Sequence, residues 1–295
     1  MLLENTDLPT QLVQLFFIID NLLNSLNRNF KQKYLPIQRT GRPAKLCASE
    51  MISLALFRYF AGFNDVKHFH RFLLSHYAHW FPRRIPDYSS FNRMINRMTP
   101  CVIFLLQWTM YCAHELSNED ESVYFIDSSS LKVCANKRIF DHKVCDGLAK
   151  RGKSSMGWFF GFKIHSVCDS MGRLINMVIT PGNTDDRKVV LKLLKGLKGL
   201  VVADAGYIKK AHIEELFKKG ITYLYDVKKN MKRVMTKAQH VVLKLRQRIE
   251  TVFSVIKYRF KAEASLARSP IGFFSRLFLA CLAYQIKQLA ITNEF

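Results

Sequence analysis

The sequence contains the run Val123-Tyr124-Phe125-Ile126-Asp127, and Leu200-Val201-Val202-Ala203-Asp204 has the same form. Short continuous apolar runs rich in β-branched and aromatic residues are typical of strands buried on both faces. A carboxylate that follows such a strand lies at the rim of the sheet, where open α/β folds bind ligands. If the strands are neighbours, the two carboxylates repel each other unless a cation such as Mg²⁺ lies between them. The alternative is that each aspartate only caps a helix or forms a turn.

The segments around these two runs predict an α/β fold. Further strands are expected at 158–168, at 174–180 and at 221–227, and helices at 184–197, 209–219, 240–259 and 271–291. Three hairpin-like strands followed by alternating strands and helices favour one mixed sheet flanked by helices.

The chain before residue 122 is predicted to be helical throughout. Apolar residues recur at spacings of three and four from Leu12 to Leu23, and Ser49, Asp65 and Asp87 are expected to be the N-caps of later helices. The acidic run 118–121 is followed by sequence rich in β-branched and aromatic residues, so the run marks a boundary. We therefore expect a helical domain over 1–121 and an α/β domain over 122–295.

Charge points to the class of partner. The chain carries 45 Lys and Arg against 23 Asp and Glu, a net charge of +22, and 49% of its 295 residues are hydrophobic. A packed protein with such an excess of positive charge is typical of nucleic-acid binders, although ribosomal and membrane-surface proteins share it. The seven cysteines have no metal-binding or disulfide spacing, and neither a signal peptide nor a membrane span is evident. We expect a cytoplasmic protein.

The helix that follows Asp87 is the candidate DNA reader. Its polar side carries Asn92, Arg93, Asn96 and Arg97, which suits the last helix of a helix-turn-helix. The alternative is a helical bundle with a solvated basic face. The extended Gly41-Arg42-Pro43 segment offers Arg42 to a minor groove, a weaker indication.

A third carboxylate is expected beside the two aspartates. On a continuous helix over 240–259, an apolar stripe from Val242 to Phe260 packs on the sheet, and Arg246, Glu250 and Lys257 form a row at its margin. Glu250 then reaches the strand ends, and the two cations can bind phosphate. The alternative is a surface Arg–Glu pair worth a few tenths of a kcal/mol.

Asp127, Asp204 and Glu250, in this order, resemble the DDE triad of RNase H-like transposases of bacterial insertion sequences. Arg246-x₃-Glu250-x₆-Lys257 matches the R-(3)-E-(6)-K part of their signature, with Leu243 in place of its leading tyrosine. The segments 154–165, 180–187 and 203–208 are also similar to that group.

The resemblance implies an RNase H-like catalytic domain preceded by a helical DNA-binding region. It implies a transposase that cleaves at terminal inverted repeats and joins the 3′ ends to target DNA, using two Mg²⁺ ions, or Mn²⁺ in their place, held by the triad. A homodimer on double-stranded DNA, in the bacterial cytoplasm and at the nucleoid, is expected. Its rivals are a DNA-binding regulator derived from a transposase and a structure-specific nuclease or resolvase.

Some residues have a local interpretation. We expect His165 to be a hydrogen-bonded histidine of the sheet, with a place in the active site as the alternative, and Asp185 and Asp186 to be helix caps. The lysines and arginines of 228–237 are expected to follow a DNA backbone. The residues expected to contact DNA are Arg42, Asn92, Arg93, Asn96, Arg97, Lys163, Lys232, Arg233, Arg246, Arg248 and Lys257.

Overall fold

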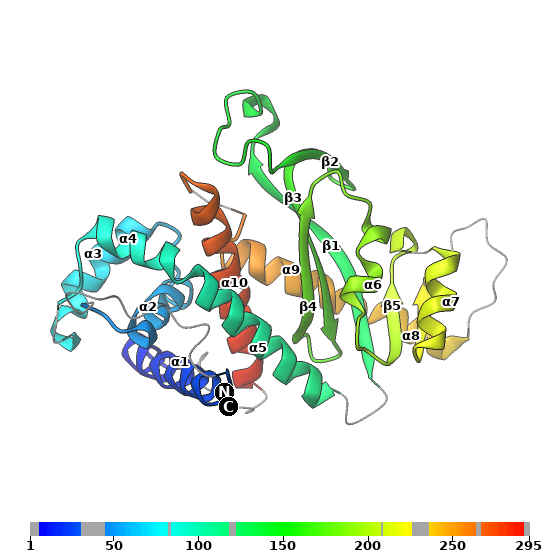
Figure 1. Cartoon of the computed structure of the whole chain (residues 1–295), viewed down its shortest axis with the longest axis horizontal. Helices are drawn as coiled ribbons and strands as arrows, with labels where there is room; N and C mark the ends of the chain where they lie inside the picture. Colours follow the sequence, from blue (N-terminus) through cyan, green and yellow to red (C-terminus); the bar gives the residue numbers. More distant parts are fainter. Residues whose placement is uncertain are drawn as a thin grey trace. The chain divides into compact units, whose positions relative to one another are not determined.

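A computed structural model describes residues 6–30, 45–81, 84–117, 122–207, 209–225, 236–263 and 267–291 (Figure 1). Two compact units are present, and each is described by itself. The helical unit comprises Met1–Thr109 with Val255–Phe295, and the sheet unit comprises Met110–Ser254. The last helix of the chain thus belongs to the unit that contains the first helices. The domain boundary expected after residue 121 lies next to residues 118–121, which are outside the described residues, and it stays a prediction.

The sheet unit is built on one mixed sheet, as the sequence predicts. Its described strands are β1 (Val123–Cys134), β2 (Lys150–Ser154), β3 (Gly157–Asp169), β4 (Leu174–Pro181), β5 (Gly199–Ala203) and β6 (Ile221–Tyr225). β1 pairs antiparallel with β3 and parallel with β5, which pairs parallel with β6. β2 and β4 both pair antiparallel with the other edge of β3. This order of antiparallel and then parallel strands is an RNase H-like α/β fold, which confirms the expected fold class.

Helices cover the sheet on both faces. The helices of this unit are α6 (Val190–Leu193), α7 (Lys210–Lys218), α8 (Lys237–Lys244) and α9 (Gln247–Ser254). α9 packs against β1 and β3 through Ile249 and Val252, which are fully buried, while α6 packs against β3 and β4 (Figure 1). The buried apolar area between the layers supplies the main stabilisation of such a unit.

The helical unit contains α1 (Leu8–Phe30), α2 (Ala48–Phe60), α3 (Val66–His76), α4 (Tyr88–Arg97), most of α5 (Thr99–Ser117), and α10 (Pro270–Ile291). The apolar stripe expected on the first helix is buried at Leu12, Leu15, Ile19 and Leu23. α10 packs against α2 and α4, and the Tyr59 hydroxyl donates to the Arg276 carbonyl at 2.8 Å. Among the described helices, none has the length and apolar character that crossing a membrane requires.

The predicted N-caps are confirmed for α3 and α4 and wrong for α2. Asp65 and Asp87 accept hydrogen bonds from the backbone N–H groups of His68 and Ser90. At α2 the cap is Cys47, whose Sγ accepts from Glu50 N–H while the Glu50 carboxylate accepts from Cys47 N–H. The reciprocal pair satisfies two N–H groups at once. Ser49 lies inside the helix instead, where it donates to Asp20 of α1 at 2.6 Å.

Two predicted helices differ in the structure, and one strand was not predicted. The helix expected over 184–197 is only the 3₁₀ turn η3 (Asp186–Lys188) and the short α6. The helix expected over 240–259 breaks after α8, resumes as α9 and ends in the π-helical turn η5 (Val255–Arg259). β2 was not expected, because its sequence, Lys-Arg-Gly-Lys-Ser, lacks apolar alternation; its pairing with β3 determines it instead.

Candidate active site

The register of the sheet brings Asp127 and Asp204 together. The parallel pairing of β1 with β5 ends at Ile126 opposite Ala203, and each of these residues is followed by an aspartate. Asp127 does not end its strand, contrary to the prediction, because the antiparallel pairing with β3 continues to Cys134. Beyond the last parallel pair the β5 side of β1 is therefore open, and both carboxylates lie at this opening.

Glu250 reaches the same opening from α9. The Arg246 guanidinium, in the turn between α8 and α9, lies 3.6 Å from the Asp204 carboxylate through Nη1 and 3.6 Å from the Glu250 carboxylate through Nη2. The Asp204 and Glu250 side chains are 54% and 57% exposed, whereas that of Arg246 is 25% exposed. A single guanidinium thus bridges two carboxylates from segments that are 46 residues apart in sequence.

Asp127 is the least exposed member of the group. Burial raises the pKa of its carboxyl to about 6, and the nearby carboxylates of Asp204 and Glu250 contribute to this rise. The hydrogen bond from Ser128 N–H to Asp127 Oδ1, at 2.7 Å, and the charge of Arg246 oppose the rise of the pKa. Asp127 thus lies within electrostatic reach of Asp204 and Glu250, which share Arg246, and we call the three carboxylates the acidic cluster.

The acidic cluster has the donor set of a divalent-metal site but not the spacing of one. Among the described residues, no three groups of His, Cys, Asp or Glu lie close enough together to hold a metal ion. Arg246 supplies the positive charge between Asp204 and Glu250 instead. Carboxylate oxygens are the ligands that Mg²⁺ and Mn²⁺ prefer, and mutual repulsion at Asp127 is what a bound cation relieves. The residue types of the acidic cluster therefore suit such an ion, whereas their spacing in this structure does not.

The other two residues of this predicted helix that were expected to contact DNA, Arg248 and Lys257, have different surroundings. Arg248 is exposed on α9. Lys257 lies in η5, within the helical unit, where its side chain is buried and its ammonium pairs with the Glu263 carboxylate at 3.2 Å. The expected row of Arg246, Glu250 and Lys257 assumed a continuous α-helix. A π-helical turn contains an extra residue, so it changes the direction in which later side chains point.

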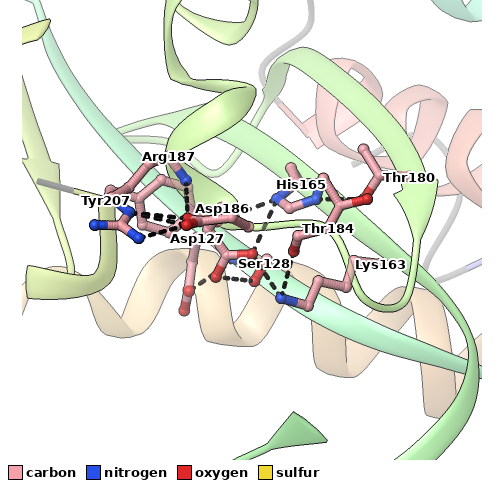
Figure 2. Close-up of polar contacts among 10 residues, drawn as sticks. Asp127, Ser128, Lys163, His165, Thr180, Thr184, Asp186, Arg187 and Tyr207 are labelled. Atoms are coloured by element: carbon pink, nitrogen blue, oxygen red, sulfur yellow. Dashed lines mark hydrogen bonds and ion pairs between the residues drawn. The ribbon is translucent and has the colours of Figure 1, made fainter. Parts of the chain in front are cut away.

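A polar network surrounds the next residue of β1, Ser128 (Figure 2). The Asp186 carboxylate accepts from Lys163 Nζ at 2.8 Å and from Ser128 Oγ at 3.3 Å. Lys163 Nζ also donates to the Thr184 carbonyl at 3.0 Å. Lys163 is therefore held by partners within the chain, and its predicted contact with DNA stays a prediction. The network ties β1 and β3 to the loop that follows β4.

His165 completes this network, and its predicted interpretation as a hydrogen-bonded histidine of the sheet agrees with its surroundings. It is fully buried opposite Ser128, with its Nε2 2.9 Å from Thr180 Oγ1 and its Nδ1 3.5 Å from the Tyr207 hydroxyl. Burial lowers its pKa to about 4, against the attraction of Asp186, so the ring is neutral at pH 7. Burial likewise raises the pKa of Tyr207.

The sequence did not indicate that Asp186 belongs to this network. Asp185 caps η3 as predicted, accepting from Arg187 N–H at 3.0 Å, whereas Asp186 pairs with Lys163. Two adjacent aspartates before a helix are equally good cap candidates in the sequence. Their roles differ because the pairing of β3 with β4 brings the loop after β4, and with it Asp186, to Lys163 of β3. Tyr207 belongs to the similar segment 203–208, but a single tyrosine carries no distinguishing pattern.

The remaining residues expected to contact DNA lie on α4 of the helical unit or outside the described residues. On α4, Arg93 and Arg97 are exposed and Asn92 and Asn96 are half-buried, while Phe91 and Ile95 face the core. This is the amphipathic arrangement the prediction requires. Arg42, Lys232 and Arg233 are outside the described residues, and so is most of the basic segment 228–237.

The chain is similar to known proteins in two comparisons. The family model described as "Transposase DDE domain" matches residues 117–270, which include Asp127, Asp204 and Glu250. A solved structure, a piggyBac transposase synaptic complex with hairpin DNA, is similar at 13% sequence identity and a TM-score of 0.45, covering 99% of this chain and 77% of that one. The search of curated proteins found no match. Since the family model spans more than half of the chain, the protein belongs to the transposase DDE domain family.

Proposed function

We propose that this transposase cleaves DNA at the terminal inverted repeats of an insertion sequence and joins the freed 3′ ends to target DNA. The observation that carries the proposal is the acidic cluster: Asp127, Asp204 and Glu250, which are far apart in sequence, meet around Arg246. A cluster of carboxylates at the open end of paired strands suits phosphoryl transfer, in which positioning and charge neutralisation do most of the work.

DDE transposases work with divalent metal ions. In this chain Asp127, Asp204 and Glu250 would hold them, and we propose two Mg²⁺ ions, with Mn²⁺ as a substitute. When bound, such ions activate water and stabilise the leaving 3′ oxygen of a phosphodiester. The half-exposed carboxylates of Asp204 and Glu250 are accessible to a hydrated ion, and the less exposed carboxylate of Asp127 forms the inner edge of the proposed site.

Arg246 has two sets of partners in this proposal. Without metal and DNA it holds Asp204 and Glu250 close together, which limits their repulsion. With DNA bound, we expect its guanidinium to turn to a phosphate, for which its planar donors are suited. Arg248 is exposed and can contact the DNA backbone. Lys257 is also proposed to contact DNA, as the signature implies, and its ammonium would then have to separate from the Glu263 carboxylate.

The partner is proposed to be double-stranded DNA, both terminal repeats and target. The net charge of +22 and the exposed arginines of α4 support this. We further propose that residues 1–121 bind DNA, that residues 122–295 catalyse, and that two copies pair the element ends. A bacterial cytoplasmic location with DNA-bound molecules at the nucleoid is part of the same proposal.

The test is the Glu250→Gln variant on terminal-repeat DNA. We expect binding within about twofold of the unchanged protein and a loss of cleavage of about 10³-fold or more with Mg²⁺ or Mn²⁺, since the amide cannot carry the metal's counter-charge. Glu214→Gln, at an exposed glutamate of α7, is the control and should cleave normally. Undiminished cleavage by Glu250→Gln would remove Glu250 from the site.

The same assay separates the rival functions. A transposase yields products in which the 3′ ends are joined to a target plasmid. A regulator binds the repeats and cuts nothing with either metal, whereas a structure-specific nuclease cuts branched DNA and joins nothing. Either of these two results would overturn the proposal.

A further inference from the structure

The segment from Lys132 to Lys153 concentrates positive charge outside the acidic cluster. It contains seven Lys and Arg against Asp141 and Asp146, a net charge of +5 in 22 residues. All seven basic side chains are exposed. The segment includes β2, whose hairpin with β3 continues the sheet away from the end of β3 that pairs with Asp127.

The hairpin of β2 and β3 has two different faces. Gly152 pairs with Phe159, and both are buried. The alternate pairs, Arg151 with Phe160 and Lys153 with Trp158, must point to the opposite face, because side chains alternate along strands. We call the four residues Arg151, Lys153, Trp158 and Phe160 the hairpin face.

The opposite side of the hairpin is packed closely against the loop after β4. A Cβ at Gly152 would lie 2.0 Å from the Gly182 carbonyl oxygen, so only glycine allows this approach of β2 to the loop after β4. The Asn136 side chain donates to the Trp158 carbonyl at 2.8 Å. The same loop carries Asp186 of the Ser128 network. The hairpin is thus joined to the rest of the sheet unit by backbone packing and hydrogen bonds.

The hairpin face and its neighbours combine exposed cations with solvent-exposed apolar side chains. Trp158 is 53% exposed, with the Arg151 guanidinium 5.1 Å and the Lys153 ammonium 5.9 Å from its ring. Met156, in the turn of the hairpin, is 88% exposed, and Phe140 is 99% exposed. A large exposed indole among cations is suited to a partner that offers both anionic groups and flat apolar groups. Nucleic acid offers phosphates and bases.

We propose that the hairpin face is a DNA-binding site, with Arg151 and Lys153 on phosphates and Trp158 packed against sugar and base edges of the element end. The inference rests on the proposed function and deepens it. Asp127 pairs with Ser166, eight residues from Trp158 along β3, so the two lie at most about 26 Å apart along the strand. That distance corresponds to about eight base pairs of duplex. The bound DNA therefore lies within one helical turn of the scissile phosphate.

The test compares Arg151→Gln/Lys153→Gln with the unchanged protein on terminal-repeat duplex, in EDTA so that no cleavage occurs. We expect affinity to fall about tenfold or more and the slope of log affinity against log salt to become shallower by about 1.8, since each phosphate contact contributes about 0.9. The control is the double variant Lys192→Gln/Lys195→Gln, which removes one charge from α6 and one just after it. It should change the affinity and the salt slope less than Arg151→Gln/Lys153→Gln does. Equal affinity and slope in both double variants would overturn the inference.

Fluorescence provides an independent measurement on folded protein. The chain has three tryptophans, and DNA should quench the emission of Trp158, so Trp158→Phe should lose most of the quench while melting at the same temperature. An unchanged quench in that variant contradicts the site.

If both double variants cleave and join terminal-repeat DNA normally, the hairpin inference fails and the proposed function stands. If the unchanged protein neither binds nor cuts that DNA, the proposed function fails. A hairpin that instead binds only an acidic protein also overturns the inference.

Discussion

Replacing Asp127 with asparagine should stabilise the metal-free protein at neutral pH while abolishing cleavage. The carboxyl has its pKa raised from 3.8 to about 6 by burial and by the carboxylates of Asp204 and Glu250. Each tenfold change in an acidity constant is worth about 1.4 kcal/mol, so ionising Asp127 in the folded protein costs about 3 kcal/mol. Asparagine keeps an oxygen for the Ser128 N–H and carries no charge.

The pH dependence has a definite sign. Because the pKa is higher in the folded than in the unfolded chain, protonated Asp127 favours folding, and this contribution is lost as pH rises from about 4 to about 6. The asparagine of the Asp127→Asn variant does not titrate, so the gain of the variant over the unchanged protein should be small at pH 4. It should grow to about 1–3 kcal/mol by pH 7 and stay constant above it, the lower bound allowing for the solvent that reaches a partly exposed cluster.

The assay is urea unfolding of both proteins in EDTA at pH 4, 5, 6 and 8, with Asp141→Asn, at an exposed aspartate, as the control for loss of one carboxylate. A variant that is less stable than the unchanged protein at pH 8 would refute the reasoning. So would a gain of the same size at pH 4 and pH 8, since the gain would then not come from the charge of the carboxylate.

Two further predictions concern the surroundings of the site. Asp186→Asn should destabilise the protein by about 1–3 kcal/mol in urea unfolding, because the Lys163 ammonium, on a side chain that is 15% exposed, loses the carboxylate with which it pairs; a change no larger than that of Asp141→Asn contradicts this. Gly152→Ala should cost about 1–3 kcal/mol or more, because its Cβ meets backbone 2.0 Å away, whereas Gly206→Ala, with open space around it, should be nearly neutral in the same measurement.

Local patterns in the sequence are enough to predict most of the elements and their order. Apolar runs ending in Asp127 and Asp204, the helical spacing from Leu12 to Leu23 and the caps at Asp65 and Asp87 all depend on neighbours within a few residues. Where the local pattern was absent or ambiguous, the strand or the helix cap was not predicted correctly. β2 has no apolar alternation, and Cys47 rather than Ser49 caps α2, because a thiol with a glutamate three residues later is an uncommon capping box.

The composition and motifs of the chain determine by themselves that it is a basic α/β protein with three candidate carboxylates, since these properties need no contact between distant segments. Only the tertiary structure decides that Arg246 lies between Asp204 and Glu250, and that Asp186 pairs with Lys163 rather than capping a helix. The physical reason is that these contacts join strands and helices through register and packing. Register and packing follow from which apolar faces bury one another, and that is a property of the whole folded unit.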